Sequence, residues 1–417
     1  MSAYSWYVSR DAGLIRILLG SPGESIDTNS PVCRRRRACG GFLPRFWHGE
    51  RYLLRLENQP MATVRLSGTV LGPDDPNRVS RARLLYLLFA SGWDITNANG
   101  DQQITLGNIE KKIIESDAFV FTPGATLEDM FKAISIFVGF QTLDRNLAGK
   151  PAIILNEDGS WNALFAVLSH LRSMGTVKQN YAEFLLAVES PEAVLDCLER
   201  VKAQGLPDAD RHPLEESEVT ILDVPVPRDY IGNACVFCSS SLEDPDYLAD
   251  GEALGRLLAE HRIGCISGAG RSGIMGAVVR GSVAAGGWTG GSNVPHIIQL
   301  EGLPDGLSSL WLRPDIYTRM QVMIEKSEAF IIFPGGSGTV QELLALMIYK
   351  HQKHPSMTGK PVVIFNREDR HGVRFWDPLI DLLSDIAQPG DFVVATALEE
   401  LLQAITPAMK KLQRRRA

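Results

Sequence analysis

The sequence of 417 residues lacks the features of several protein classes. No apolar run reaches the roughly 18 residues that a membrane-spanning helix needs, and the N-terminus lacks the basic and then apolar segments of a signal peptide. The net charge of −7 argues against a general nucleic-acid binder. The six cysteines follow neither a disulfide nor a zinc-ligand spacing. We therefore expect a protein of the reducing cytoplasm, without a membrane, nucleic-acid or metal partner.

Two cysteines do stand close together, in the segment "ACVFCSSS". A redox C-x-x-C motif places both sulfurs at the start of a helix. Cys235 and Cys238 instead lie in an apolar run typical of a β-strand, where positions three apart point to opposite faces. We favour strand residues over a redox or metal-binding pair.

What the chain does contain is a regular alternation of strand and helix patterns. Apolar runs such as "DAFVFT" and "PAIIL" alternate with helical stretches such as "PEAVLDCLERVKAQ", which predicts parallel sheets in doubly wound α/β domains. The length exceeds what one core usually serves, so we expect two Rossmann-like domains in tandem. The predicted parts are a poorly ordered, dispensable or partner-binding extension at 1–60, a trimmed domain at 61–205, a linker at 206–229, a catalytic domain at 230–408 and a frayed basic tail at 409–417.

The two predicted domains repeat one another. The segments "AFIIFPGGSGTVQELLALM" (329–347) and "GKPVVIFN" (359–366) correspond to "AFVFTPGATLEDMFKAI" (118–134) and "GKPAIILN" (149–156). The first copy lacks the long glycine-rich segment at 271–318 and keeps only Gly124 in the loop where the second has three glycines. This pattern predicts a tandem duplication in which the first copy has been trimmed.

The second copy carries a candidate phosphate site. An apolar strand, the loop "PGGSGT" and an amphipathic helix follow one another. Free backbone N–H groups and the helix dipole attract an anion, and glycines allow it a close approach. The plainer alternative is a tight turn. The candidate phosphate-binding residues are Gly335, Gly336, Ser337, Gly338 and Thr339.

A second glycine loop lies upstream, between the strand "IGCIS" and a predicted helix from about residue 274. Gly268, Gly270 and Gly273 form a G-x-G-x-x-G pattern. A dinucleotide site needs an acidic residue about 20 positions further on, and "GGWTGGSNVP" contains none. We therefore predict a mononucleotide bound across the two glycine loops.

Two charged residues are candidates for chemistry. Glu342 lies just after the loop of residues 334–339, the phosphate cradle. The pattern Thr339-x-x-Glu342 would also serve as a helix-capping box without catalysis. Arg319 lies ten residues before the strand. The first copy keeps an acid at Asp129 but has Asn108 in place of the arginine. The joint loss of arginine and glycines in one copy indicates that they share a function.

With these motifs the second half resembles the LONELY GUY family of cytokinin-activating phosphoribohydrolases. The family motif P-G-G-x-G-T-x-x-E matches residues 334–342, and the family arginine matches Arg319. The upstream glycine loop, including Met275, and the serine loop after the first strand, including Ser240, match as well. The departures are Met320 for a lysine, Gln341 for a glutamate, and Ala269 and Ser239 for loop glycines.

The resemblance implies hydrolysis of the N-glycosidic bond of a nucleoside 5′-monophosphate to free base and ribose 5-phosphate, without a cofactor. It assigns Arg319 and Glu342 to catalysis, and the two glycine loops with Met275 and Ser240 to substrate binding. Family members associate through helices near the active site, so we expect the first copy to replace a sister subunit within the chain, while a homodimer stays possible. The alternative is a non-catalytic nucleotide-sensing or molybdenum-cofactor carrier protein, which needs the cradle but not the arginine–glutamate pair.

Overall fold

The computed structural model describes residues 5–11, 14–20, 62–67, 76–96, 106, 109–207, 219 and 222–416. Contacts within the chain divide it into two units, Met1–Pro60 and Met61–Ala417. In the first unit, β1 (Ser5–Asp11) pairs antiparallel with β2 (Leu14–Gly20). Most of the predicted N-terminal extension and the predicted counterpart of Arg319, Asn108, lie outside the described residues.

The first sheet has five parallel strands in the order β4-β3-β5-β6-β7. Alternate residues of β5 face opposite sides, as the strand period requires: Phe119 and Phe121 join one hydrophobic cluster, and Ala118 and Val120 another. The elements of this half are β3 (Thr63–Ser67), α1 (Arg78–Ala90), β4 (Asp94–Thr96), α2 (Ile109–Ile114), β5 (Ala118–Phe121), α3 (Leu127–Gln141), η3 (Arg145–Leu147), β6 (Ala152–Leu155), α4 (Asn162–Ser173), η4 (Tyr181–Glu183), β7 (Leu185–Val188) and α5 (Pro191–Gln204).

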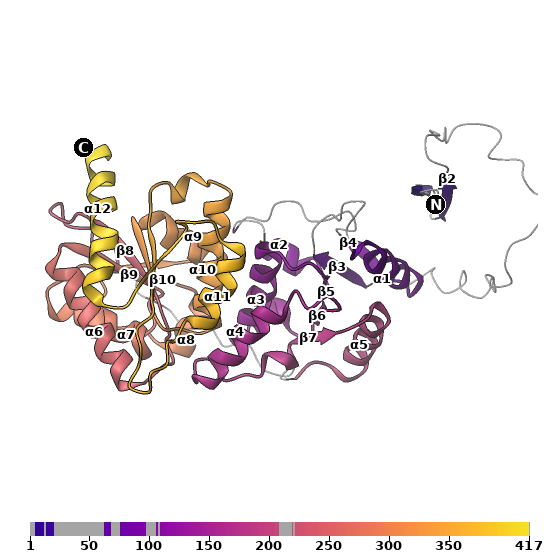
Figure 1. Cartoon of the computed structure of the whole chain (residues 1–417), viewed down its shortest axis with the longest axis horizontal. Coiled ribbons are helices and arrows are strands. Elements are labelled where there is room, and N and C mark those ends of the chain that lie inside the picture. Colours follow the sequence, from indigo (N-terminus) through magenta and orange to yellow (C-terminus); the bar gives the residue numbers. More distant parts are fainter. Residues whose placement is uncertain are drawn as a thin grey trace, which may run out of the picture. The chain divides into compact units, whose positions relative to one another are not determined.

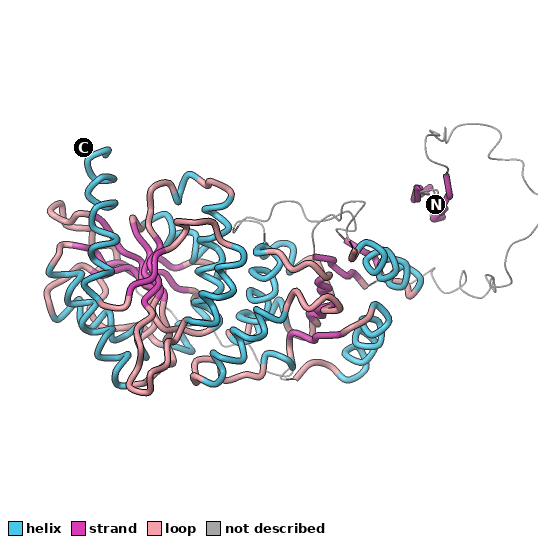
Figure 2. Tube along the Cα trace, viewed as in Figure 1, coloured by secondary structure: helices cyan, strands magenta, loops and turns pink. Residues whose placement is uncertain are grey.

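The second sheet has seven parallel strands in the order β11-β10-β9-β8-β12-β13-β14, with helices around it (Figures 1 and 2). The predicted α/β class with two parallel sheets is therefore confirmed. The elements are β8 (Gly232–Phe237), α6 (Pro245–Glu260), β9 (Ile263–Ser267), α7 (Gly273–Ala284), β10 (Thr289–Asn293), α8 (Pro295–Glu301), β11 (Ser309–Leu312), α9 (Ile316–Lys326), β12 (Ala329–Ile332), α10 (Ser337–His351), η5 (Pro355–Met357), β13 (Val362–Phe365), α11 (Asp377–Ile386), β14 (Val393–Ala395) and α12 (Leu398–Arg416).

The two halves make the same contact at matching positions of the Gly-Lys-Pro segments. Lys150 Nζ donates to the carbonyl of Ile113 at 2.9 Å, and Lys360 Nζ donates to the carbonyl of Ile324 at 2.8 Å. In each case the lysine binds a carbonyl near the end of the helix that precedes the central strand. The correspondence seen in the sequence thus extends to three-dimensional contacts. Among the described residues, the first sheet has no strands corresponding to β10 and β11.

The halves meet through their helices, with α3 packed on α10 and α4 packed on α11. Gln341 Nε2 donates to Ser135 Oγ at 2.9 Å, and Gln352 Nε2 donates to Glu128 Oε1 at 3.2 Å. Because the partner number falls along α3 as it rises along α10, the two helices run antiparallel. The glutamine at 341, a departure from the family pattern, thus bonds to the first half.

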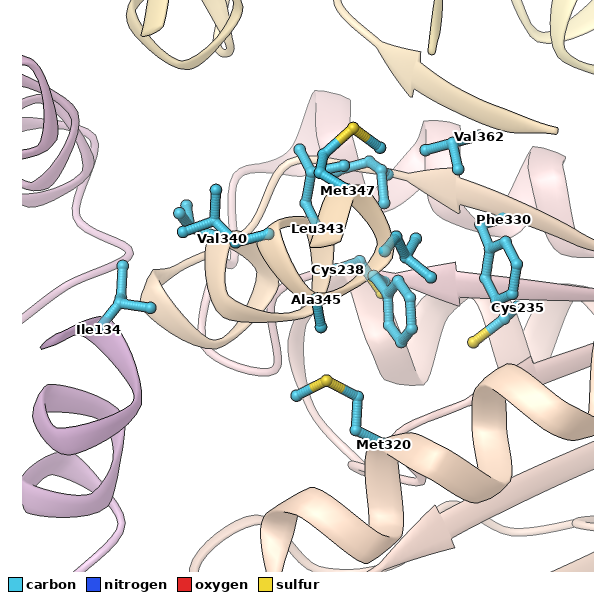
Figure 3. Packing of buried hydrophobic residues seen from close by; sticks show 14 of the residues in the cluster. Ile134, Cys235, Cys238, Met320, Phe330, Val340, Leu343, Ala345, Met347 and Val362 are labelled. Carbon is cyan, nitrogen blue, oxygen red and sulfur yellow. The ribbon is translucent and has the colours of Figure 1, made fainter. Parts of the chain in front are cut away.

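Helix α10 is buried almost all round, so the prediction of an amphipathic helix is wrong. One side lies against the sheet and the other against α3, and Figure 3 shows Ile134 of α3 on the side that carries Val340. Both residues are fully buried. A helix covered on two sides needs apolar residues around its whole circumference, which removes the periodic signal of a surface helix.

Two predicted boundaries also differ from the structure. The end of the predicted linker joins the second sheet, since Asp223 forms an antiparallel bridge with Ser309 and Val224 N–H donates to the carbonyl of Ser308 at 3.0 Å. Helix α12 continues through the predicted tail to Arg416, and Met409 is fully buried. No helix in the described ranges is long and apolar enough to cross a membrane.

Candidate active site

The candidate site lies where the strand order of the second sheet reverses, between β8 and β12. Loops at the carboxyl ends of parallel strands diverge at such a point and leave room for a ligand. The loop after β8 and the glycine loop after β12 are held together by the Ser239 N–H, which donates to the Pro334 carbonyl at 3.0 Å. The predicted residues of both loops are thus brought to one edge of the sheet.

The glycine loop after β12 ends in an uncapped helix. Helix α10 begins at Ser337, its N-cap is Gly336, and no side chain caps it. The capping box of Thr339 and Glu342, the alternative considered from the sequence, is absent, because both residues lie inside the helix. The N–H groups of the first turn have no intrahelical acceptors and carry the positive end of the helix dipole. This end of α10 can accept an anion.

Glu342 lies beside Arg319 at this edge. Arg319 Nη1 is 3.6 Å from Glu342 Oε1, and both side chains are nearly buried. The guanidinium is held in place by two carbonyls, since its Nε donates to Ser292 at 2.9 Å and its Nη2 to Gly268 at 3.4 Å. A side chain at Gly268 would overlap Arg319, so glycine is required there. The arginine and glutamate of the two motifs thus form one buried pair.

Burial raises the pKa of Glu342 from 4.5 to about 7. Arg319 lowers that pKa but does not offset the burial, and the carboxylate of Glu301 raises it further. Near neutral pH, Glu342 is therefore close to the midpoint of its titration, as a group that exchanges protons during catalysis should be.

The upstream glycine loop surrounds a carboxylate that the sequence did not single out. Ser240 Oγ donates to Glu301 Oε1 at 2.6 Å, and a side chain at Gly270 would come within 2.8 Å of Glu301 Oε2. The Gly270 N–H donates to Met275 Sδ at 3.0 Å. The available signal was that Glu301 is the single acidic residue between Arg271 and Pro304.

One residue of this loop is under backbone strain. Ala269 has φ +58°, in the left-handed region where a side chain costs about 1–2 kcal/mol relative to glycine. The family pattern has a glycine at this position, a residue that adopts such a φ without this cost. Gly273, where α7 begins, has φ +61° and lies against the backbone of Ser240.

The corresponding loop of the first half is filled by the protein's own side chains. The Gly124 N–H donates to Asp158 Oδ2 at 2.8 Å and to Ser160 Oγ at 3.0 Å, and the Ala125 N–H donates to Ser160 Oγ at 3.0 Å. Burial alone would raise the pKa of Asp158, but hydrogen bonds from Ser160, Gly124 and Asn77 lower it. A carboxylate thus occupies the loop where the second half has an open helix end.

Helix α3 also differs from α10 at the position of Glu342. Thr126 is the N-cap of α3 and forms a capping box with Asp129. Counted from the proline of each loop, this N-cap comes one residue later than Gly336, the N-cap of α10. Counted from the first helical residue, Lys132 is the sixth residue of α3, as Glu342 is of α10. Asp129 therefore does not occupy the place of Glu342. Lys132 forms a buried ion pair with Asp129 at 3.3 Å.

The cysteines of the C-x-x-C segment are free and buried below this site. Cys235 lies in β8 as predicted, and Cys238 follows the end of that strand. Burial raises the pKa of both thiols well above its usual value, which keeps them protonated. Within the described ranges, no group of three or more His, Cys, Asp or Glu side chains could hold a metal ion.

The fold and this site together define a Rossmann-type α/β protein with an uncapped helix start at the switch point of its second sheet. A family model described as "possible lysine decarboxylase" matches residues 275–414. A cytokinin riboside 5′-monophosphate phosphoribohydrolase of Mycobacterium marinum is 30% identical over 168 residues, which cover 40% of this chain and 84% of that protein. A probable enzyme of the same name from Oryza sativa subsp. japonica is 29% identical over 189 residues, which cover 44% of this chain and 78% of that protein.

The chain belongs to this family of phosphoribohydrolases, which confirms the resemblance stated from the motifs. The solved structure of the molybdenum-cofactor carrier protein from Chlamydomonas reinhardtii is also similar, with 18% identity and a TM-score of 0.33. The match covers 43% of this chain and 98% of the carrier protein.

Proposed function

We propose that the second half hydrolyses the N-glycosidic bond of a nucleoside 5′-monophosphate. Water adds its oxygen to C1′ of the ribose, the C1′–N bond breaks with its electron pair moving to the base, and the base takes up a proton. The products are free base and ribose 5-phosphate. The observation that carries this proposal is the uncapped start of α10 beside the buried pair of Arg319 and Glu342.

The phosphate is assigned to the start of α10. The N–H groups of Ser337, Gly338 and Thr339 and the helix dipole supply the positive potential there. The sequence predicted a mononucleotide bound across the two glycine loops, and Glu301, which ends α8 beside the upstream loop, would repel its phosphate there. We therefore assign Gly268, Gly270, Gly273, Met275 and Ser240 to the ribose and base side of the nucleotide.

Glu342 is assigned to the chemical step. As the glycosidic bond breaks, positive charge develops on the ribose, and a nearby carboxylate stabilises it. With a pKa of about 7, the same carboxylate can take a proton from the attacking water. Arg319 orients Glu342, since its remaining donors are fixed on the Ser292 and Gly268 carbonyls.

Glu301 is assigned to the ribose hydroxyl groups. It is oriented by Ser240, and one of its oxygens lies toward Gly270, where the absence of a side chain leaves space. A carboxylate that accepts hydrogen bonds from two neighbouring hydroxyls is a common way to hold a ribose. Glu301 also keeps the pKa of Glu342 high.

We assign to the first half the role of a partner subunit within the same chain. Its loop is filled by Asp158 and Ser160, and its α3 covers the helix that carries Glu342. A nucleotide in the first half would have to displace a carboxylate that accepts several hydrogen bonds. We therefore expect one substrate site for each chain.

The test is to incubate the chain with AMP, CMP, GMP, UMP and a cytokinin riboside 5′-monophosphate, and to measure free base by chromatography. We expect base release from at least one nucleotide and none from the matching nucleoside, because the nucleoside lacks the phosphate. Tight nucleotide binding without release from any of the five would favour the carrier or sensor alternative instead.

A further inference from the structure

The first half contacts the phosphate cradle directly through Gln141, the last residue of α3. Ser337, the first residue of α10, donates its hydroxyl to Gln141 Oε1. The Gln141 Nε2 in turn donates to Gln179 Oε1 at 3.1 Å, which fixes the orientation of the amide. The first turn of α10 is thus joined by side chains to two separate segments of the other half.

A second contact supports the same turn from the loop after α4. The Thr176 carbonyl oxygen lies 2.9 Å from the place where a side chain at Gly336 would begin. Thr176 is itself fixed, because its N–H and Oγ both donate to the Leu171 carbonyl, at 3.1 and 3.0 Å. Gly336 is therefore required by the close approach of the first half, and not only by the approach of a phosphate.

The contact from Gln141 to the first residue of α10 has no equivalent at the other end of the helix pair. The last residue of α10 is His351, which contacts Asp391 Oδ2 at 2.9 Å, and the first residue of α3 is the apolar Leu127. The pair equivalent to Ser337 and Gln141 is thus Leu127 and His351, without a hydroxyl to bind. The polar contact at that end is the one from Gln352 to Glu128, in which the glutamine donates instead of accepting.

We propose that Gln141 is a positioning residue for the cradle that binds the 5′-phosphate. By accepting the Ser337 hydroxyl, it fixes the first turn of α10, whose N–H groups point to the phosphate. The first half thereby contributes to substrate affinity from outside the catalytic domain. This inference rests on the proposed function for the identity of the ligand.

The test compares Gln141→Met with Gln352→Met in the full chain. Methionine keeps the length and volume of glutamine but removes the acceptor. Gln352 is also a glutamine that joins the two helices, as the donor of a hydrogen bond to Glu128 at the other end of α10. The probe is ribose 5-phosphate, measured by calorimetry without turnover. We expect the Kd to rise about tenfold for Gln141→Met, the value of one hydrogen bond, and less than twofold for Gln352→Met.

Two further variants separate positioning from packing. Gln141→Glu places a negative charge beside the cradle, so its Kd should rise more than that of Gln141→Met and depend more strongly on salt. Ser337→Ala should raise the Kd as well, and the double variant Ser337→Ala with Gln141→Met should bind like either single one, because one interaction is removed in both. In turnover, KM should rise while kcat stays within about twofold of the wild type.

The proposal is overturned if Gln352→Met weakens binding as much as Gln141→Met, or if the two effects at Ser337 and Gln141 add independently. It is also overturned if Gln141→Met binds like the wild type. A chain that binds ribose 5-phosphate but releases no base would contradict the proposed function alone. The two failures are therefore distinguishable, because binding is measured apart from turnover.

Discussion

Replacing Glu342 with glutamine should abolish turnover and stabilise the protein above neutral pH. Glutamine resembles the protonated carboxyl, which the buried site favours. The pKa of Glu342 is raised from 4.5 to about 7, so ionising it in the folded state costs about 3 kcal/mol at 1.36 kcal/mol for each unit. The structure contains no capping role for Glu342 that would be lost in this variant.

The pH dependence of the free energy of unfolding sets the sign of the predicted stability change. Because the folded pKa of Glu342 exceeds the unfolded value, the folded protein binds more protons between pH 4.5 and about 7. The wild type therefore loses stability across this range as the pH rises. Glu342→Gln cannot ionise and should not show this loss, so its advantage should reach about 3 kcal/mol by pH 8 and vanish near pH 4.

The assay is thermal unfolding from pH 4 to pH 9 together with base release at each pH. Glu328→Gln is the matched control, since Glu328 is a buried carboxylate that accepts the Asn233 N–H at 2.7 Å at the opposite edge of the sheet. The control should alter stability but leave turnover intact. If Glu342→Gln releases base at the wild-type rate, or melts earlier than the wild type at pH 8, the assignment of Glu342 is refuted.

Three other changes test separate parts of the site. Arg319→Met removes the cation facing Glu342, so the pKa of Glu342 should rise above about 7. Base release should then fall at pH 7 and recover partly in alkaline buffer, and a pH profile of base release identical to that of the wild type would contradict this. Gly338→Ala adds a methyl with no protein atom within 4 Å, and should stabilise α10 by about 0.5–1 kcal/mol in thermal unfolding while weakening ribose 5-phosphate binding, whereas unchanged binding would place the phosphate elsewhere. Calorimetry of the wild type should give one ribose 5-phosphate for each chain, because Asp158 fills the other loop, and two equivalent sites would disprove that closure.

Much of the fold could be predicted because its signals are local. Most strands of the two sheets are short apolar runs, although β10 reads "TGGSN". The segment "PEAVLDCLERVKAQ" forms α5 over the predicted residues, with Ser190 as its N-cap. The pairing of Arg319 with Glu342 could be predicted from two motifs at a known spacing. In both cases the residues that decide the structure stand close together in the chain or in a recognised motif.

The missed features depend on contacts between distant segments. Glu301 meets Ser240 across 61 positions, and Asp158 meets Gly124 across 34, so no local pattern connects them. The capping box is absent for another reason: α10 begins at Ser337, after a loop that is one residue shorter than that of the first half, and tertiary packing fixes that start. Local helix propensity thus predicted the helix correctly but not the residue at which its first turn begins.

The central claim is that the pair of Arg319 and Glu342 cleaves the glycosidic bond of a nucleotide bound at the start of α10. Phosphorus NMR of the chain with AMP, combined with chromatography of the base, tests it most directly. We predict that the AMP signal is replaced by that of ribose 5-phosphate, with one adenine for each AMP consumed, and that Glu342→Gln shows neither product. An AMP signal that shifts on binding but persists unchanged in amount would contradict the account.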